Sequence, residues 1–92
     1  MTTLLKVSKN VFGQHCLKAV KSINTSNTIY RFSGPVYEYA TRTSLKIDRN
    51  KYVEDKYVRF LNYSTEPNAQ IKNDLLIALK PIECNDEITI NL

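Results

Sequence analysis

The chain has 92 residues, of which 42% are hydrophobic and 24% are charged, and its formal net charge at pH 7 is +4. This length allows a single domain, 1–92, with one modest core, and the composition excludes a disordered chain. Lys and Arg are spread along the sequence without a block, so the basic excess favours acidic partners only weakly.

Cys16 and Cys84 lie far apart, and His15 is the only histidine, so no zinc spacing is present and no disulfide is implied. No apolar run is long enough for a signal peptide or a membrane span. We therefore expect an intracellular protein with reduced thiols, no metal site and no membrane partner, in a compartment that the sequence does not identify.

The first periodic segment is the triplet Leu17, Val20 and Ile23, whose spacing of three predicts a short helix. A cluster of Asn, Ser and Thr at 22–28 should end it early. The rest of the chain alternates with a period of two, which indicates strands. In chain order, these are 36–40, 45–47, 58–61 and 88–92. The run 75–79 is apolar throughout and is predicted to be a strand buried on both faces.

Turn residues separate these strands, and only two glycines are present, Gly13 and Gly34. Asn is therefore expected to occupy some of the turn positions that need a positive φ. Breaks are predicted at Gly13, 24–27, Gly34-Pro35, 66–68, 72–74 and 85–86. The sequence thus predicts a small, mostly-β domain of several short sheets with little helix.

The most specific motif is RFLNYSTEPNA at 59–69, which matches the pattern R-F-[IL]-N-H-S-C-x-P-N-A at eight of its eleven positions. Upstream, 13–17 (GQHCL) is placed like a G-x-G-V-F loop, 23–29 like an I-x-x-G-x-x-I turn, and 31–36 (RFSGPV) like an F-x-G-x-V strand. Downstream, 78–92 is similar to a segment that ends in G-E-E-[IL]-T-[FI]-[DN]-Y. In this order, the segments resemble a SET domain, the β-clip fold of S-adenosylmethionine-dependent protein-lysine methyltransferases.

The resemblance implies a pocket for S-adenosylmethionine between the Gly-rich loop and the end of the long motif. Gly13 and Gln14 would offer backbone groups to the cofactor, because a residue without Cβ lets a ligand approach closely. Asn62 would hold the amino end of the cofactor and Tyr63 its adenine. Arg59 would lie on the strand that leads to this site, or is simply a surface arginine. Tyr63 either stacks on adenine or borders the core with its hydroxyl in water.

The sequence departs from the family pattern at four positions. His15 replaces the second glycine of the loop, Tyr63 replaces His, and Thr65 replaces Cys. Leu92 stands where the family has a Tyr whose hydroxyl lies beside the transferred methyl group. The catalytic residues are therefore not identified. Tyr52 and Tyr57 are alternative sources of a phenol, although both residue positions also suit a core tyrosine.

Three hypotheses follow. The first is a minimal protein-lysine methyltransferase that acts on a lysine-containing protein or peptide, with histones among the candidates, and that forms a homo-oligomer to complete the lysine channel. The second is a degenerate SET domain that binds cofactor or partner proteins without chemistry. The third is a small basic β module for nucleic acid, because Lys51-Tyr52, Lys56-Tyr57 and Arg59-Phe60 alternate charge and aromatic rings. This nucleic-acid function is not expected, since any amphipathic strand produces the same alternation.

Overall fold

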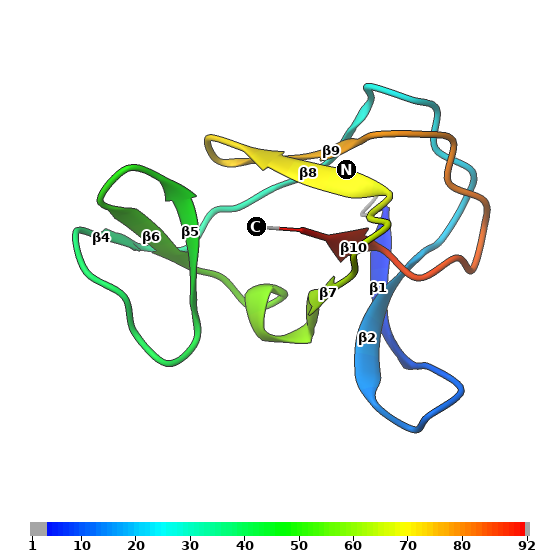
Figure 1. Ribbon diagram of the computed structural model, residues 1–92, viewed down its shortest axis with the longest axis horizontal. Coiled ribbons are helices and arrows are strands. Elements are labelled where there is room, and N and C mark those ends of the chain that lie inside the picture. Colours follow the sequence, from blue (N-terminus) through cyan, green and yellow to red (C-terminus); the bar gives the residue numbers. More distant parts are fainter. Residues whose placement is uncertain (1–3, 92) are drawn as a thin grey trace.

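The computed structural model describes residues 4–91. In this range the chain forms short strands in four small sheets and one 3₁₀ helix, which confirms the mostly-β prediction (Figure 1). The elements are β1 (Leu5–Lys9), β2 (His15–Ala19), β3 (Thr28–Arg31), β4 (Val36–Tyr37), β5 (Ser44–Asp48), β6 (Lys51–Glu54), η1 (Val58–Phe60), β7 (Asn62–Tyr63), β8 (Ala69–Lys72), β9 (Leu75–Ala78) and β10 (Thr89–Ile90).

The first two strands form an antiparallel hairpin in which Leu5 pairs with Ala19 and Lys9 with His15. The predicted helix around Leu17 is therefore wrong. β2 is hydrogen-bonded on both sides, because Ile88 N donates to Leu17 O (2.8 Å) and Ala19 N to Asp86 O (3.0 Å) on the side away from β1. Long-range pairing on both edges outweighs a weak helical spacing that contains β-branched residues.

β3, β9 and β8 form the second sheet, with β9 in the centre. Leu76 and Ala78 of β9 are buried, whereas Leu75 and Ile77 are half-buried. The prediction of a strand at 75–79 is confirmed for Leu75–Ala78, but burial on both faces is wrong. One face of this sheet covers the core, and the other stays partly open.

The third sheet has the order β4-β6-β5. Its first strand is shorter than predicted and covers only Val36–Tyr37. Gly34 precedes it at a point where the backbone crosses β6: a Cβ atom on Gly34 would lie 1.3 Å from the carbonyl oxygen of Glu54. Glu54 N also donates to Pro35 O at 2.9 Å. Only glycine allows the two chain segments to approach this closely.

The predicted strand at 58–61 is instead the 3₁₀ helix η1. Val58 N donates to Asp55 O (3.1 Å) and Phe60 N to Tyr57 O (3.0 Å), so these residues satisfy their backbone locally. Val58 is buried and Arg59 is exposed, which produces an apolar–polar alternation without a strand. The chain becomes extended only at β7, which pairs in parallel with β10 through Asn62↔Thr89 and Tyr63↔Ile90.

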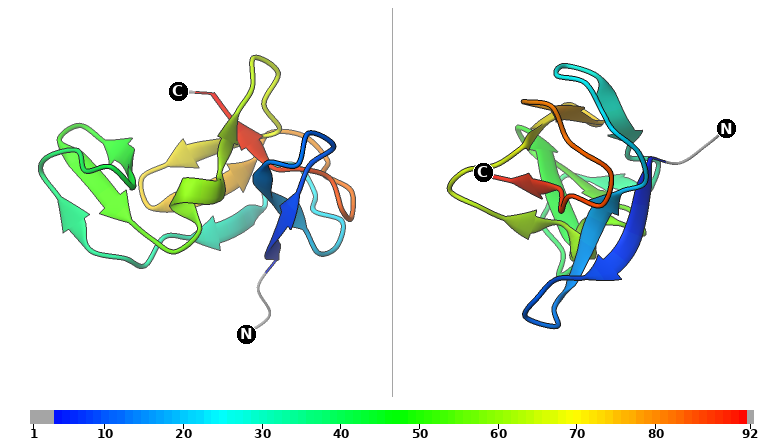
Figure 2. Two further views of the ribbon diagram at one scale, coloured as in Figure 1. Left: turned by 90° about the horizontal axis from the view of Figure 1, so that it is seen from below. Right: turned by 90° about the vertical axis from the view of Figure 1, so that its right-hand side faces the viewer.

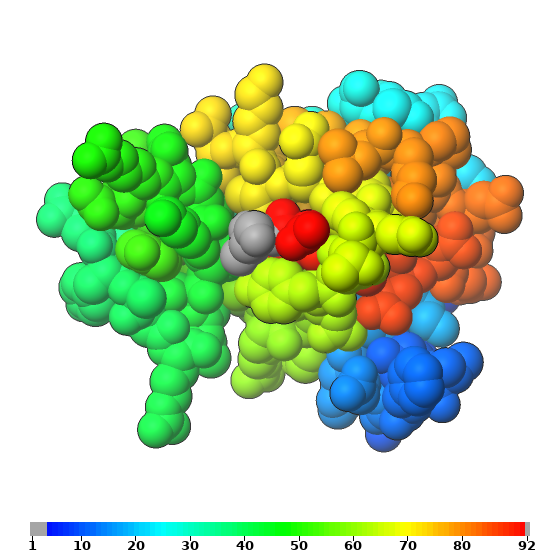
Figure 3. Space-filling view, in the orientation of Figure 1, coloured from blue at the N-terminus to red at the C-terminus, as the bar shows by residue number. Residues whose placement is uncertain are grey.

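The C-terminal segment 85–90 runs between the hairpin and β7. It contacts β2 through the bridge Lys18↔Glu87 and β7 through the bond from Ser64 N to Ile90 O (2.9 Å). Figure 2 shows β10 between these elements, and in Figure 3 the red segment lies in the middle of the face with yellow and yellow-green residues around it. The chain segments that carry the motifs therefore meet around the C-terminal segment 85–90.

The buried side chains form one hydrophobic cluster to which all the sheets contribute. Its members are Leu5, Leu17, Ala19, Ile23, Ile29, Phe32, Leu45, Val53, Val58, Leu61, Ala69, Leu76, Ala78, Ile82, Ile88 and Ile90.

Asparagine occupies three of the tight turns, as the scarcity of glycine predicted. Asn50, Asn73 and Asn85 have φ values of 56°, 56° and 72°, and Ser26 is also positive at 69°. Asparagine adopts the left-handed backbone region more readily than most residues other than glycine.

Candidate functional site

The three motif segments meet at the side chain of Asn62. Its Nδ2 donates to the carbonyl oxygen of His15 at 3.2 Å and to Oε2 of Glu87 at 2.9 Å. These partners lie 47 and 25 residues away in the sequence. One amide group thus joins the end of the first loop, the long motif and the C-terminal segment.

A row of rings and charges lies beside this junction. The His15 ring is 5.8 Å from the Phe60 ring between centroids, and the guanidinium carbon of Arg59 lies 4.9 Å from the Phe60 centroid. Arg59 is exposed and Phe60 is half-buried. Cation–π contact with Phe60 therefore holds the Arg59 head group near the surface over η1.

The loop between β1 and β2 is organised by the side chain of Asn10. Its Oδ1 accepts hydrogen bonds from Phe12 N (3.0 Å) and Gln14 N (3.1 Å). Gly13 has φ = +78°, and a Cβ built there would meet no atom within 4 Å. The space beside Gly13 is therefore open. However, the Gly13 N–H donates to Asn10 O (3.0 Å) and Gln14 O accepts from Asn10 N (2.9 Å), so most backbone polar groups of the two residues are engaged within the loop.

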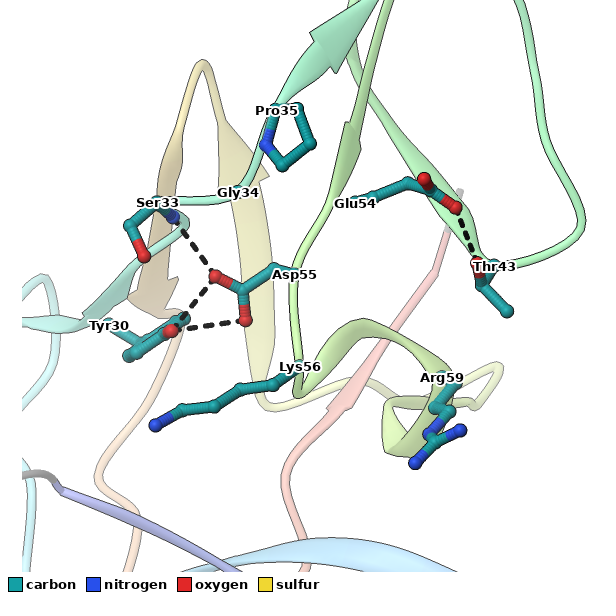
Figure 4. Close-up of a pocket in the computed structure, with 9 residues that line it drawn as sticks. All are labelled: Tyr30, Ser33, Gly34, Pro35, Thr43, Glu54, Asp55, Lys56 and Arg59. Atoms are coloured by element: carbon teal, nitrogen blue, oxygen red, sulfur yellow. Dashed lines mark hydrogen bonds between the residues drawn. The ribbon is translucent and has the colours of Figure 1, made fainter.

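Arg59 and Thr43 both line two neighbouring hollows. The smaller hollow, of about 160 Å³, is bounded by the 42–44 segment on one side and by η1 and β7 on the other, and it includes Tyr63. Figure 3 shows a notch between the green and the yellow-green residues at this place. The larger hollow, of about 620 Å³, is drawn in Figure 4. Its size is in the range of small-molecule sites.

A hydrogen-bonded cluster around Asp55 forms one wall of the larger hollow (Figure 4). The Tyr30 hydroxyl donates to both carboxylate oxygens at 3.0 and 2.9 Å. The backbone N–H groups of Ser33 and Tyr57 each donate to the same carboxylate at 3.0 Å. Burial first, and then the hydrogen bond to Asp55 and its negative charge, raise the pKa of Tyr30 to about 12.

The opposite wall carries Glu54, which accepts from the hydroxyls of Thr43 and Thr41. These hydrogen bonds, with that of Thr43 the larger cause, lower the pKa of Glu54, so the carboxylate is ionised at neutral pH. Both carboxylates of the hollow are thus engaged within the protein. The cationic groups of Lys56 and Arg59 have no carboxylate partner within residues 4–91, and they remain available to an anionic group.

Comparison with known proteins identifies the family to which the chain belongs. The SET domain model matches residues 4–91. The chain belongs to the SET domain family, which is a family of methyltransferases. Among solved structures, 103 chains match, and one of them is a candidate histone methyltransferase of Plasmodium falciparum. That structure superposes with a TM-score of 0.74 at 19% identity, over 99% of this chain and 94% of the other. No curated protein matches the chain significantly.

The predicted site residues of this SET domain fall into two groups. Arg59 and Asn62 lie together near His15, and Tyr63 follows directly with 63% of its surface exposed. Gly13 and Gln14 lie farther out in the exposed loop, and no hydrogen bond or ring contact joins them to the other three within residues 4–91. Leu92, the position of the family tyrosine, lies outside the described residues.

Sequence reasoning did not foresee three of the site's structural groups. Glu87 belongs to a matched motif, but only the fold shows that it accepts from Asn62. Phe60 links His15 to Arg59, and Asp55 fixes one wall of the larger hollow.

The two phenols considered as substitutes for the family tyrosine lie elsewhere. The Tyr57 ring packs edge-on against Tyr30 at 5.1 Å and borders the core. Tyr52 pairs with Tyr37 across β4 and β6. Neither residue lines the two hollows that border Arg59.

Within residues 4–91, no cluster of three His, Cys, Asp or Glu residues is arranged to hold a metal ion. In the same range, none of the helices has the length and apolar character to cross a membrane.

Proposed function

We propose that this SET domain binds S-adenosylmethionine beside Arg59 and Asn62 and transfers its methyl group to a lysine of a protein substrate. The observation that carries the proposal is the junction at Asn62, because it brings the three motif segments to one place next to a hollow. A histone methyltransferase is among the proteins with this fold, which makes histones reasonable first substrates.

The residues present fit the cofactor. The Arg59 guanidinium is exposed and can pair with a carboxylate, which guanidinium groups bind in bidentate geometry. The Oδ1 of Asn62 makes no hydrogen bond with residues 4–91, so it can accept from an amino group. The exposed ring of Tyr63 offers a stacking surface for adenine. Of the backbone groups of Gly13 and Gln14, the Gly13 carbonyl accepts no hydrogen bond within residues 4–91, and it offers one further acceptor.

When bound, the cofactor supplies a methyl group on a sulfonium ion. The protein must then hold the lysine amine neutral, in line with that methyl, and away from water, so catalysis consists of positioning and electrostatics. Glu54 is ionised and held by Thr41 and Thr43, so it can attract an incoming ammonium group to the hollow.

Calorimetric titration with S-adenosylmethionine, followed by a methyl-transfer assay on basic peptides, tests the proposal. Arg59→Gln should weaken cofactor binding about tenfold or more, because a charge-assisted contact is lost. Arg49→Gln is the matched control, since Arg49 is also an exposed arginine and lies in the turn between β5 and β6. Absence of heat at millimolar cofactor would contradict the proposal, as would equal affinity of the two variants.

A second candidate function is cofactor binding without methyl transfer. The observation that favours it is that neither Tyr52 nor Tyr57, the two phenols considered as substitutes for the family tyrosine, lines either hollow. Binding without transfer in the same assay would select this function.

The correspondence between Leu92 and the family tyrosine can be tested separately. Leu92→Tyr with a short added tail should raise methyl transfer, because it restores a hydroxyl where the family has one. Leu92→Phe with the same tail is the control for ring size. Unchanged activity in the Tyr variant would mean that Leu92 does not correspond to the family tyrosine.

A further inference from the structure

The orientation of the Asn62 side-chain amide decides which group this residue presents to a ligand. An amide carries two N–H donors on its nitrogen and an acceptor on its oxygen. In the structure, Nδ2 donates both to the His15 carbonyl oxygen (3.2 Å) and to Oε2 of Glu87 (2.9 Å). A carbonyl and a carboxylate are both acceptors, so the nitrogen must face them and Oδ1 must point away.

The Glu87 carboxylate is the stronger of these two acceptors. The bond that it receives from Asn62 is the shorter one, and a hydrogen bond to a carboxylate is roughly twice as strong as one between neutral groups. Within residues 4–91, no other group donates a hydrogen bond to this carboxylate, and no Lys or Arg lies within 4.0 Å of it. In this range the carboxylate therefore acts on the Asn62 amide alone.

The backbone of Glu87 is fixed by the elements on either side of it. Its carbonyl oxygen accepts from Asn68 Nδ2 at 2.8 Å, and the residue forms a β-bridge with Lys18 of β2. The neighbouring residues 86 and 88 are hydrogen-bonded to β2 at 3.0 and 2.8 Å. The half-buried side chain of Glu87 therefore reaches Asn62 from a fixed position.

We propose that Glu87 is a positioning residue, which orients the Asn62 amide so that Oδ1 accepts from the amino group of the cofactor. This role rests on the proposed cofactor binding beside Asn62. The reverse orientation would set Oδ1 against the two acceptors, His15 O and the Glu87 carboxylate. It would also turn an N–H group toward an ammonium group, which has donors only. Glu87 thus acts on the cofactor through Asn62, without touching it.

Calorimetric titration of the chain with two ligands tests this role. The ligands are S-adenosylmethionine and its des-amino analogue, in which hydrogen replaces the amino group. Glu87→Leu should weaken the binding of S-adenosylmethionine about fivefold or more, because the amide loses its stronger acceptor. Glu87→Gln should weaken it less, since its side-chain oxygen can still accept from Asn62. Neither variant should change the affinity for the analogue, whereas a merely structural defect would weaken both ligands equally.

Glu83→Leu is the matched control. Glu83 is an exposed carboxylate four residues before Glu87, and its side chain makes no hydrogen bond with residues 4–91. The substitution removes the same charge and introduces the same side chain, so it should leave the affinity for both ligands unchanged. The comparison separates the orientation of Asn62 from a general loss of negative charge near the C-terminal segment.

A measurement without cofactor completes the test. In NMR spectra, the Nδ2 protons of Asn62 should exchange with water more slowly in the wild-type chain than in Glu87→Leu. Equal exchange rates would overturn the proposal, as would an unchanged affinity of Glu87→Leu for S-adenosylmethionine or equal losses for the two ligands. A wild-type chain that binds no S-adenosylmethionine would contradict the proposed function and the role toward the cofactor, while the exchange rates would still decide whether Glu87 orients Asn62.

Discussion

Tyr30 and Asp55 show how single residues shape the candidate site. The Asp55 carboxylate receives the Tyr30 hydroxyl and two backbone N–H groups, and it thereby connects β3, the approach to β4 and the start of η1. The Tyr30 ring also packs edge-on against Phe32 and Tyr57, at 5.5 and 5.1 Å. The wall of the larger hollow is thus fixed before any ligand arrives.

Tyr30→Phe should destabilise the protein by about 1–2 kcal/mol, because it removes a hydrogen bond to a charged acceptor but keeps the ring packing. Urea denaturation measures the change. Tyr39→Phe is the control, since Tyr39 is 63% exposed and its hydroxyl makes no hydrogen bond with residues 4–91. Equal stability of the two variants would show that the bond to Asp55 contributes nothing.

The same residue predicts an alkaline pH dependence. The pKa of Tyr30 rises from about 10 to about 12 on folding, so the folded state holds the proton that the unfolded state loses. This contribution to stability is complete below pH 10 and is lost as the pH rises toward 12. In Tyr30→Phe the slope of unfolding free energy against pH should be shallower between pH 10 and 12.

Some site residues could be predicted from the sequence and others could not. Asn62 was found because its motif has fixed spacing, and the structure places it at the junction of the three segments. The contact of His15 with Phe60 brings together β2 and η1, which are distant in the sequence, so no local pattern encodes it. Whether Gly13 and Gln14 bind the cofactor remains a prediction.

At the scale of the elements, side-chain hydrogen bonds hold the short strands together as much as the backbone hydrogen bonds between strands do. Asn68 Nδ2 donates to Glu87 O (2.8 Å), and Thr89 N donates back to Asn68 Oδ1 (2.9 Å). The carbonyl of Asn68 also accepts from Leu79 N at 2.8 Å. The proline–asparagine pair of the long motif therefore has a structural role that anchors β10 beside β8.

The two glycines provide a matched pair for testing the sheets. Gly34→Ala should cost at least about 2 kcal/mol, because the new Cβ would overlap the Glu54 carbonyl and force β4 away from β6. Gly13→Ala meets open space and should cost only about 1 kcal/mol, from its positive φ.

Thermal unfolding of both variants measures the difference. If Gly13→Ala lowered the unfolding temperature more than Gly34→Ala did, the close approach of Gly34 to the Glu54 carbonyl would not be the tighter constraint on stability.

Strands with clean alternation could be predicted, and segments with mixed signals could not. Leu45 is buried and Ile47 is half-buried, whereas Lys46 and Asp48 are exposed, so β5 follows its pattern. The alternation at 58–61 has the same appearance, yet the bonds from Val58 N to Asp55 O and from Tyr57 N to Asp55 Oδ1 favour a 3₁₀ turn. Local hydrogen bonding, which composition does not reveal, decides such segments.

At the scale of the whole molecule, most of the organisation comes from contacts between distant segments. β7 and β10 pair in parallel, and Asn62 of β7 donates to Glu87, which lies 25 residues away in the sequence. Ile23 likewise pairs with Ile82, with hydrogen bonds of 2.7 and 2.9 Å between their backbones. Proteins dominated by such pairings fold slowly for their size.

The position of the C-terminal segment has a consequence for synthesis. Residues 85–90 supply hydrogen-bond partners to both β2 and β7, and they contribute Ile88 and Ile90 to the core. During translation, residues 85–90 are synthesised after the hairpin and after β7. The hairpin and β7 must therefore wait with Leu17 and other apolar side chains uncovered, and the native core closes only after residue 90 is released.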